Sequence, residues 1–322
     1  MDTDIGTAVG NEVGSAASAH GDHRRGLAAG AGAYTLWGLV TIYWHALGGI
    51  DASTLIAWRI VGSVVLLAVV VALRRAWRPL VALRDLRILG RTGVAALALA
   101  TNWTLYVWCV THDRVVDAAL GYLLSPIGMV AAGALVLREH LRPAQRGALA
   151  LAVTSVVVLA FGYGQVPVFA VLIAATWTLY GVLKKRVRFD PLTGLTAETV
   201  VLAPFAVAFL ALQGMTGGTG LAGAGRLDLV LIAFAGLVTA VPLLLFAYAA
   251  GRIPLTTLGW LQYIVPTINL VLGVALYGES MPAWRIAGFV IAWLALVAVS
   301  IDGWFGARPA GRIEPEPVPL EG

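Results

Sequence analysis

Two ionisable residues lie inside long apolar stretches of the sequence, where a charge is costly. Arg59 and Glu198 each stand about six residues into such a stretch, 139 residues apart. At the rise of an α-helix each lies roughly 8–9 Å deep, and a charge at a helix centre costs about 2.5–3.5 kcal/mol. Arg59 is therefore a candidate to bind an anionic group of a substrate, and Glu198 a candidate proton-coupling or amine-binding acid. The alternatives are that Arg59 snorkels to the interface and that Glu198 accepts a local hydrogen bond.

A third apolar stretch carries an amide and aromatic rings at helical spacing. Asn102 and Tyr106 are four residues apart and share one helix face, with Trp103 beside them. An amide among aromatic rings near the bilayer midplane suits a semi-polar organic ligand, so these three are candidate substrate-binding residues. The alternative is an interhelical hydrogen bond of about 0.6 kcal/mol among packing aromatics. Trp108 is expected to anchor the stretch at the membrane interface.

Two further stretches each contain a proline preceded by polar residues. The candidate substrate-binding residues here are Tyr122, Ser125, Gln262 and Tyr263, and the prolines that follow are Pro126 and Pro266. Each proline removes one helix hydrogen bond and can kink a membrane helix, and neighbouring polar groups can satisfy the freed carbonyls. The kinks are candidate hinges beside a cavity, or else packing kinks. Asn269, one turn further on, carries less weight.

Other conspicuous residues have a structural and a functional interpretation. Trp37 and Tyr180 line a substrate cavity or pack in the core. Glu139 and Glu279 follow apolar stretches and are expected to bind loop backbone or a basic neighbour. His45 is expected to be structural.

Motifs of known catalytic and metal sites are absent from the sequence. There is no G-x-x-x-x-G-K-[ST] loop, no H-E-x-x-H and no G-x-S-x-G. The single cysteine, Cys109, can form neither an internal disulfide nor a multi-cysteine site. We therefore expect no enzymatic activity, no cofactor and no metal, and any transport would draw on an ion or solute gradient.

The composition places these residues in a membrane. Of 322 residues, 59% are apolar and 12% are charged, with a mean hydropathy of +0.85. Soluble domains have roughly 45–50% apolar and about 25% charged residues. This apolar excess excludes soluble enzymes and nucleic-acid-binding proteins. The net charge of +5 is informative through the positions of the basic residues along the chain.

Ten apolar stretches are long enough to cross a bilayer as helices, which takes about 20 residues. They are about 28–47, 54–73, 92–111, 117–137, 145–162, 166–183, 192–213, 229–250, 255–276 and 283–302. On this topology 18 of the 22 Lys and Arg residues fall on the side of the termini, and three on the other. The positive-inside rule then makes both termini cytoplasmic. Residues 1–26 and 306–322 are expected to be disordered tails.

The sequence also repeats itself. The pattern aromatic-Thr-Leu-aromatic-Gly occurs at 34–38 and again at 177–181. At nearly the same offset, matches pair Asp51 with Asp190, Arg114 with Arg252, 120–123 with 258–261, Pro126 with Pro266 and Glu139 with Glu279. The chain thus divides into five-helix units at 27–164 and 165–305. Because five is odd, the second unit enters the membrane from the opposite side, and such inverted repeats place substrate sites near the midplane between the halves.

On these residues the chain resembles the EamA-type drug/metabolite transporters, and among them the RarD-like (chloramphenicol-sensitive protein) group. The resembling segments are 33–38, Arg59, 102–103, 119–122, 125–126, 198–199, 239–242, 257–266 and 277–279. The resemblance spans residues 28–302 and departs in the tails and in the glycine-rich segment 214–225. It implies a bacterial inner-membrane carrier of ten helices in two EamA repeats that moves small metabolites outward.

The expected function is secondary active transport of a small organic metabolite or drug-like solute across the cytoplasmic membrane. We expect alternating access, export, and a proton as the candidate coupling ion, with the solute and the lipid bilayer as partners and no nucleic acid. Two alternatives stay open. A membrane-embedded enzyme acting on a lipid-linked substrate would need acids, His or Ser clustered near one interface. The second alternative is a channel or a structural scaffold, and a channel would show rings of like charge or a filter loop.

Overall fold

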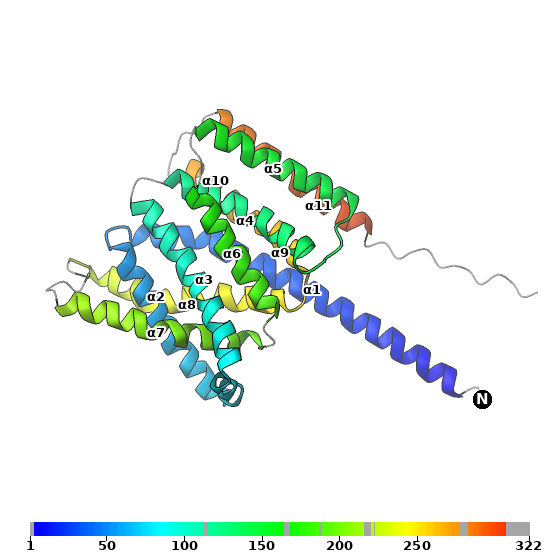
Figure 1. Ribbon diagram of the computed structural model, residues 1–322, viewed down its shortest axis with the longest axis horizontal. Coiled ribbons are helices and arrows are strands. Elements are labelled where there is room, and N and C mark those ends of the chain that lie inside the picture. The colour runs from blue at the N-terminus through cyan, green and yellow to red at the C-terminus, as the bar shows by residue number, and fades with distance from the viewer. Residues whose placement is uncertain are drawn as a thin grey trace, which may run out of the picture.

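The computed structural model describes residues 3–111, 115–163, 168–186, 189–215, 220–221, 223–276 and 283–306. All regular secondary structure in these ranges is helical, and the helices pack into one bundle (Figure 1). The all-α class predicted from the sequence is thereby confirmed.

The helices follow the predicted apolar stretches closely. In order they are α1 (Thr3–Ala46), α2 (Ala52–Leu73), a short 3-10 helix η1 (Arg78–Arg84), α3 (Leu86–Thr111), α4 (Val115–Leu135), α5 (Pro143–Tyr163), α6 (Val168–Arg186), α7 (Pro191–Met215), α8 (Arg226–Ala250), α9 (Leu255–Leu261), α10 (Ile264–Ala275) and α11 (Ala283–Gly306). Each predicted stretch falls on one helix, except the ninth, which is divided between α9 and α10.

Several helices are suited to a bilayer by length and composition. Within the described ranges five stretches are long and apolar enough to cross a membrane: Ala52–Leu73, Val168–Arg186, Pro191–Met215, Arg226–Ala250 and Leu255–Leu272. Shorter apolar stretches lie at Gly121–Leu135, Pro143–Val158 and Ile286–Val299. The chain is therefore a multi-pass membrane protein.

Helix α1 is longer than the apolar stretch that predicted it. It begins at Thr3, so residues 3–26, for which we expected a disordered tail, are helical. The apolar helix that follows supplies the nucleus from which it extends. Figure 1 shows this N-terminal part projecting from the bundle. The other predicted tail lies outside the described residues after Gly306.

The main contacts between α-helices of the first half and α-helices of the second half have equivalent contacts in which the two halves are interchanged. Helix α1 packs on α8, and α6, which is equivalent to α1, packs on α3. In the same way α2 packs on α8 while α7 packs on α3. Helix α5 pairs with its own counterpart α11, and the two lie side by side at one edge of the bundle (Figure 1).

Equivalent glycines make equivalent close contacts in this arrangement. A Cβ on Gly38 of α1 would lie 2.7 Å from Cβ of Ile268 in α10, and a Cβ on Gly181 of α6 would lie 2.6 Å from Sδ of Met129 in α4. Gly38 and Gly181 end the repeated motif, and Met129 and Ile268 are 139 residues apart. The contact is reciprocal, as at an interface with two-fold symmetry. Small residues at such points let membrane helices approach closely.

The matched aspartates Asp51 and Asp190 begin equivalent helices. Asp51 accepts a hydrogen bond from the backbone nitrogen of Thr54 at 3.0 Å, and Asp190 accepts one from that of Thr193 at 3.1 Å. Each carboxylate satisfies a helix-start N–H that has no partner within its helix. The repeated aspartates therefore fix where α2 and α7 start.

Loops with an expected cytoplasmic location meet at one end of the bundle. Glu139, after α4, accepts hydrogen bonds from the backbone nitrogens of Leu255 and Thr256 at 2.8 and 2.9 Å. Lys185 of α6 lies 3.7 Å from the same carboxylate. The structural role expected of Glu139 is confirmed, since it joins the end of α4 to the start of α9. Glu279 lies outside the described residues.

Candidate solute-binding cavity

A cavity of about 550 Å³ lies between the two halves of the chain. Its walls come from α1, α2, α3, α4, α6, α8 and α10, and it reaches the α1–α2 loop at Gly48 and Gly49. Eight of the ten predicted substrate-binding residues line it: Trp37, Arg59, Asn102, Trp103, Tyr106, Tyr122, Ser125 and Gln262. The structure thus brings together, from both halves, residues selected for their polarity within apolar sequence.

Arg59 lies in this cavity in a defined setting. Its Nε donates a hydrogen bond to the hydroxyl of Thr239 at 3.1 Å. Its guanidinium carbon lies 4.5 Å from the ring centroid of Trp44 and 4.5 Å from that of Trp103. Cation–π contacts of this kind are worth roughly 2 kcal/mol when desolvated. Arg59 is therefore held inside the bundle by aromatic faces, and does not snorkel away from them.

The polar residues of α3 and α4 divide between packing and the cavity. Nδ2 of Asn102 donates to the carbonyl of Ile173 at 2.7 Å and to the hydroxyl of Thr176 at 3.1 Å, which ties α3 to α6. The Ser125 hydroxyl donates to the Gly121 carbonyl within α4 at 2.7 Å. These bonds match the structural alternatives considered from the sequence, although both residues also line the cavity.

The two copies of the repeated motif meet at one side of the cavity. Trp37 lies edge-on to Trp177, with ring centroids 5.3 Å apart, and Tyr34 and Tyr180 flank them at 5.5 Å from their neighbours. Phe246 of α8 contacts all four rings. We call these five residues the aromatic cluster. Tyr34, Trp37 and Trp177 line the cavity, whereas Tyr180 is fully buried behind them.

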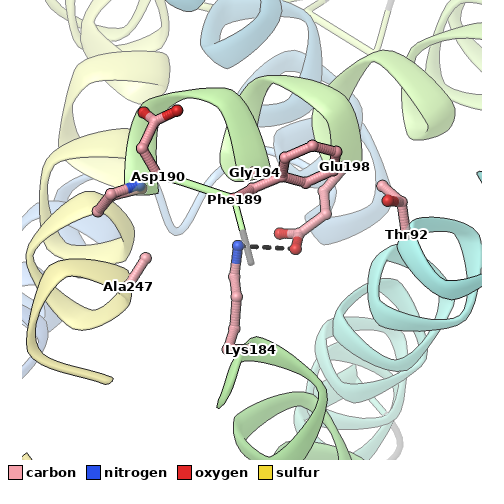
Figure 2. A pocket seen from close by; sticks show the side chains of 8 residues that line it. Thr92, Lys184, Phe189, Asp190, Gly194, Glu198 and Ala247 are labelled. Atoms are coloured by element: carbon pink, nitrogen blue, oxygen red, sulfur yellow. Dashed lines mark ion pairs between the residues drawn. The ribbon is translucent and has the colours of Figure 1, made fainter. Parts of the chain in front are cut away.

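Glu198 lies on the far side of the aromatic cluster from the cavity. Its Oε1 is 2.7 Å from Nζ of Lys184, with side-chain exposures of 5% and 7%, and its Oε2 accepts a hydrogen bond from Tyr180 at 3.2 Å. Figure 2 shows Lys184 at the end of α6 pointing to Glu198 on α7, with Asp190 and Thr92 nearby. The space at this ion pair is only about 20 Å³, room for roughly one water.

Both halves of the chain match the same family. The EamA-like transporter family matches residues 24–161 and again residues 166–301. The chain belongs to the EamA-like transporter family. The two matches confirm the duplication inferred from the repeated motifs, and with it the resemblance from which a membrane carrier was expected.

Relatives with similar sequences cover almost the whole EamA-like chain. Protein RarD of Streptomyces exfoliatus is 41% identical over 293 residues, which covers 90% of this chain and 92% of that protein. An uncharacterized transporter of Bacillus subtilis, YojE, is 35% identical and covers 86% and 94%. Protein RarD of Escherichia coli is 32% identical and covers 90% and 98%. The chain is thus a RarD-like EamA transporter.

A solved structure shares the fold. A crystal structure aligns with a TM-score of 0.66 over 86% of this EamA-like transporter and 97% of the other chain, at 18% identity. At that identity the likeness shows the fold alone.

The two proline-containing stretches differ in shape. Helix α4 continues through Pro126 from Val115 to Leu135. In the equivalent stretch α9 ends at Leu261 and α10 begins at Ile264, with Pro266 in its first turn; Gln262 and Tyr263 at this break keep helical backbone angles and make tighter i→i+3 hydrogen bonds. Gln262, at the break, accepts a hydrogen bond from Nε1 of Trp177 at 3.1 Å. Tyr263 is buried beside Trp260, away from the cavity.

Three residues gain a place in these sites that the sequence did not give them. Trp44 stands near the end of its stretch, where an interfacial anchor is the ordinary expectation. Thr239 fell within a resembling segment without a role. Lys184 was counted among the cytoplasmic basic residues, yet it is buried and paired with Glu198. The sequence signal that could have predicted this ion pair is a lysine at the end of one apolar stretch followed by a glutamate inside the next.

Among the described residues, no group of three or more His, Cys, Asp or Glu side chains lies close enough to hold a metal ion.

Proposed function

We propose that this EamA-like transporter is a secondary carrier that moves a small organic solute across the bacterial inner membrane by alternating access. The observation that carries the proposal is the cavity of about 550 Å³ between the repeats, lined by residues of both. Solute-sized pockets of roughly 300–1,000 Å³ with few polar groups are typical ligand sites. Of the predicted binding residues, those in the cavity would contact the solute, while Tyr180 and Tyr263 would act from behind it.

The proposed architecture is ten membrane crossings in two inverted repeats. The contacts of Gly38 with Ile268 and of Gly181 with Met129 support it, because a two-fold axis would map the first pair onto the second. Two five-helix units related by an axis in the membrane plane would face opposite sides. With ten crossings both termini lie in the cytoplasm, consistent with the excess of Lys and Arg on that side.

The proposed state is open to the outside and closed to the cytoplasm. The cavity extends to the α1–α2 loop, which the charge distribution assigns to the outer side. Toward the basic loops it ends at the aromatic cluster, and the Lys184–Glu198 pair lies beyond. Rocking of one repeat against the other would part these contacts and close the outer mouth, with Pro126 and the break before Pro266 as hinges.

Glu198 is the proposed coupling residue. A buried ion pair that loses one partner leaves a charge that is costly to keep in place. If Lys184 moves away when the cytoplasmic side opens, a proton on Glu198 would offset that cost. Inward proton movement could then drive export of the solute.

Transport in proteoliposomes tests the function. Metabolite profiling of the medium around overexpressing and deletion cells first identifies solutes whose export depends on the gene. Purified protein should then catalyse saturable flux of such a solute, and an imposed pH gradient should accelerate it. Glu198→Gln should remove the response to the gradient. If no solute changes in the medium and none is transported, the proposed carrier function is wrong. If Glu198→Gln still responds to the pH gradient, the carrier function stands and only the proposed coupling role of Glu198 is wrong.

A further inference from the structure

We infer that the solute class is organic monoanions with a flat apolar ring, and that Arg59 binds the anionic group. This rests on the proposed transport function, since it names what the same cavity carries. Three properties of the cavity support it: a cation in its wall without a carboxylate partner, the hydrogen-bonding atoms left unused, and the aromatic side chains that form its walls.

Arg59 is the cation of the cavity wall among the residues that the structure describes, and none of their carboxylates pairs with it. Among the described residues no carboxylate lies within 4.0 Å of the Arg59 guanidinium. Within the described part of the lining the other charged side chain is Asp51, at the mouth, more than 4.0 Å from the guanidinium and held by hydrogen bonds from the backbone and hydroxyl of Thr54. A buried charge is stabilised by one opposite charge. A cationic solute would add repulsion, and a dianion would bring an excess negative charge.

The guanidinium of Arg59 presents one pair of donors to the cavity. Its Nε is used by Thr239, and its carbon lies against the rings of Trp44 and Trp103. The hydrogen bond to Thr239 is the one that the guanidinium makes to the described residues, so the two Nη atoms remain for a ligand. Two parallel N–H groups of this kind bind both oxygens of a carboxylate or sulfonate. Thr239 and the indoles thus hold Arg59 in position for a planar oxyanion.

The amides that line the cavity mostly have donors to spare. Oδ1 of Asn269 accepts from the Thr41 hydroxyl at 2.8 Å, which leaves Nδ2 available, and Oε1 of Gln262 accepts from Trp177, which leaves Nε2. Asn102 is the reverse, because its Nδ2 is used and its Oδ1 remains. Two spare donors in addition to Arg59, against one spare amide acceptor, favour a solute rich in acceptor oxygens.

The walls beside Arg59 are aromatic. Tyr106 and Tyr122 lie edge to face with ring centroids 5.4 Å apart, and both line the cavity with Trp44 and Trp103. Flat rings pack on such surfaces and gain the contact energy of aromatic pairs. Because the rings and the cation share one wall, the anionic group and the apolar ring belong to the same molecule.

A set of naphthalene compounds of equal shape and different charge tests this inference. Full-length protein in lipid nanodiscs is titrated calorimetrically at pH 8 with 2-naphthoate, 2-naphthamide, 2-naphthylmethylammonium and 2-naphthyl phosphate, and with acetate as the anion without a ring. 2-Naphthoate should bind at least about tenfold tighter than each of the others. Equal or tighter binding of the amide, the cation or the dianion would overturn the inference, and so would binding of none of them.

Arg59 variants link the preference to the residue. Arg59→Gln should weaken 2-naphthoate binding at least about 30-fold, the loss typical of removing one partner of a desolvated charge pair. Arg59→Lys keeps the charge without the paired donors and should fall in between. Arg91→Gln, an exposed arginine on α3, is the matched control and should bind normally. Unchanged binding by a folded Arg59→Gln would contradict the assignment.

Two precautions keep the outcomes distinct. If Arg59→Gln does not fold, Thr239→Val removes the acceptor for Nε and should weaken 2-naphthoate binding, while Thr239→Ser should retain it. Saturable export of a neutral or cationic solute, with no preference for 2-naphthoate, would exclude the anion class and leave the carrier function standing. Preferential binding of 2-naphthoate without flux of any anion would exclude the carrier function instead.

Discussion

Glu198 contacts Lys184 and Tyr180 inside the bundle, and removing Lys184 should reveal how much this pairing contributes to stability. Lys184→Met should lower the free energy of unfolding by about 3–5 kcal/mol, because it leaves a buried carboxylate without its cation. Lys184→Met combined with Glu198→Gln should recover most of that loss, since neither charge then remains. Thermal unfolding in detergent measures both effects.

Arg186→Met is the control for this pair, because Arg186 is exposed on the same last turn of α6. It should leave the unfolding temperature unchanged. A Lys184→Met protein as stable as the unmodified one would show that Glu198 needs no cationic partner.

At the scale of single residues, the sequence predicted which charged residues are engaged inside the bundle but not the residues that contact them. The cost of a charge in an apolar stretch singled out Arg59 and Glu198, and both are engaged inside the bundle. The partners Trp44, Thr239 and Lys184 lie on other helices, and no local spacing connects them. Which side chains meet depends on the packing of the helices, and it separated Arg59 and Glu198 to opposite sides of the aromatic cluster.

Among the elements, α2 and α8 cross at two glycines, Gly62 and Gly236, where a larger side chain should lower the free energy of unfolding. A Cβ on Gly236 would overlap the backbone of Gly62 and Ser63, which cannot rotate away. Gly236→Ala should therefore cost about 1–3 kcal/mol in stability, the range for overpacked sites. Chemical or thermal unfolding of the purified protein measures it.

Gly93→Ala serves as the comparison, because Gly93 lies in α3 with nothing within 4 Å of an added Cβ. There the substitution should be neutral or stabilise by up to about 1 kcal/mol, the helix propensity difference between the two residues. Equal effects at both positions would contradict the close crossing of α2 and α8.

The elements themselves were largely predictable from apolar length, because the bilayer sets how long a helix must be. The exceptions have physical causes. Proline in the ninth stretch predicted a kink, but whether a helix bends or breaks depends on neighbours such as Trp177, which binds Gln262 at the break. The extension of α1 to Thr3 continues a helix that is already nucleated in the apolar stretch, which hydropathy does not measure.

For the whole molecule, the orientation in the membrane can be tested with single cysteines. In a Cys109→Ala background, Gly49→Cys on the α1–α2 loop should react with a membrane-impermeant maleimide in intact cells. His140→Cys on the α4–α5 loop should react only after the cells are permeabilised, because the positive-inside rule predicts that the basic loops face the cytoplasm. Both positions are exposed.

The background protein without cysteine provides the blank for labelling. The reverse labelling pattern would invert the proposed orientation, and labelling of both positions from outside would exclude an odd number of crossings between them.

The duplicated plan was visible in the sequence because matched residues occur at a nearly constant offset. A site between the halves was predicted as well, with eight residues of its lining, but not the full set of walls, which combine α1–α4 with α6, α8 and α10. Internal matches reveal that two units exist, but the space left between them depends on how side chains of both units pack.

The unequal shapes of α4 and of α9 with α10 carry a consequence for the rest of the cycle. One sequence pattern is held in two forms, unbroken around Pro126 and divided before Pro266. Under the proposed alternating access, the units would exchange these forms: α4 would be interrupted near Tyr122, α9 and α10 would join, and the mouth would turn to the cytoplasm. Each unit would then be the template for the other's shape in the proposed inward-facing state.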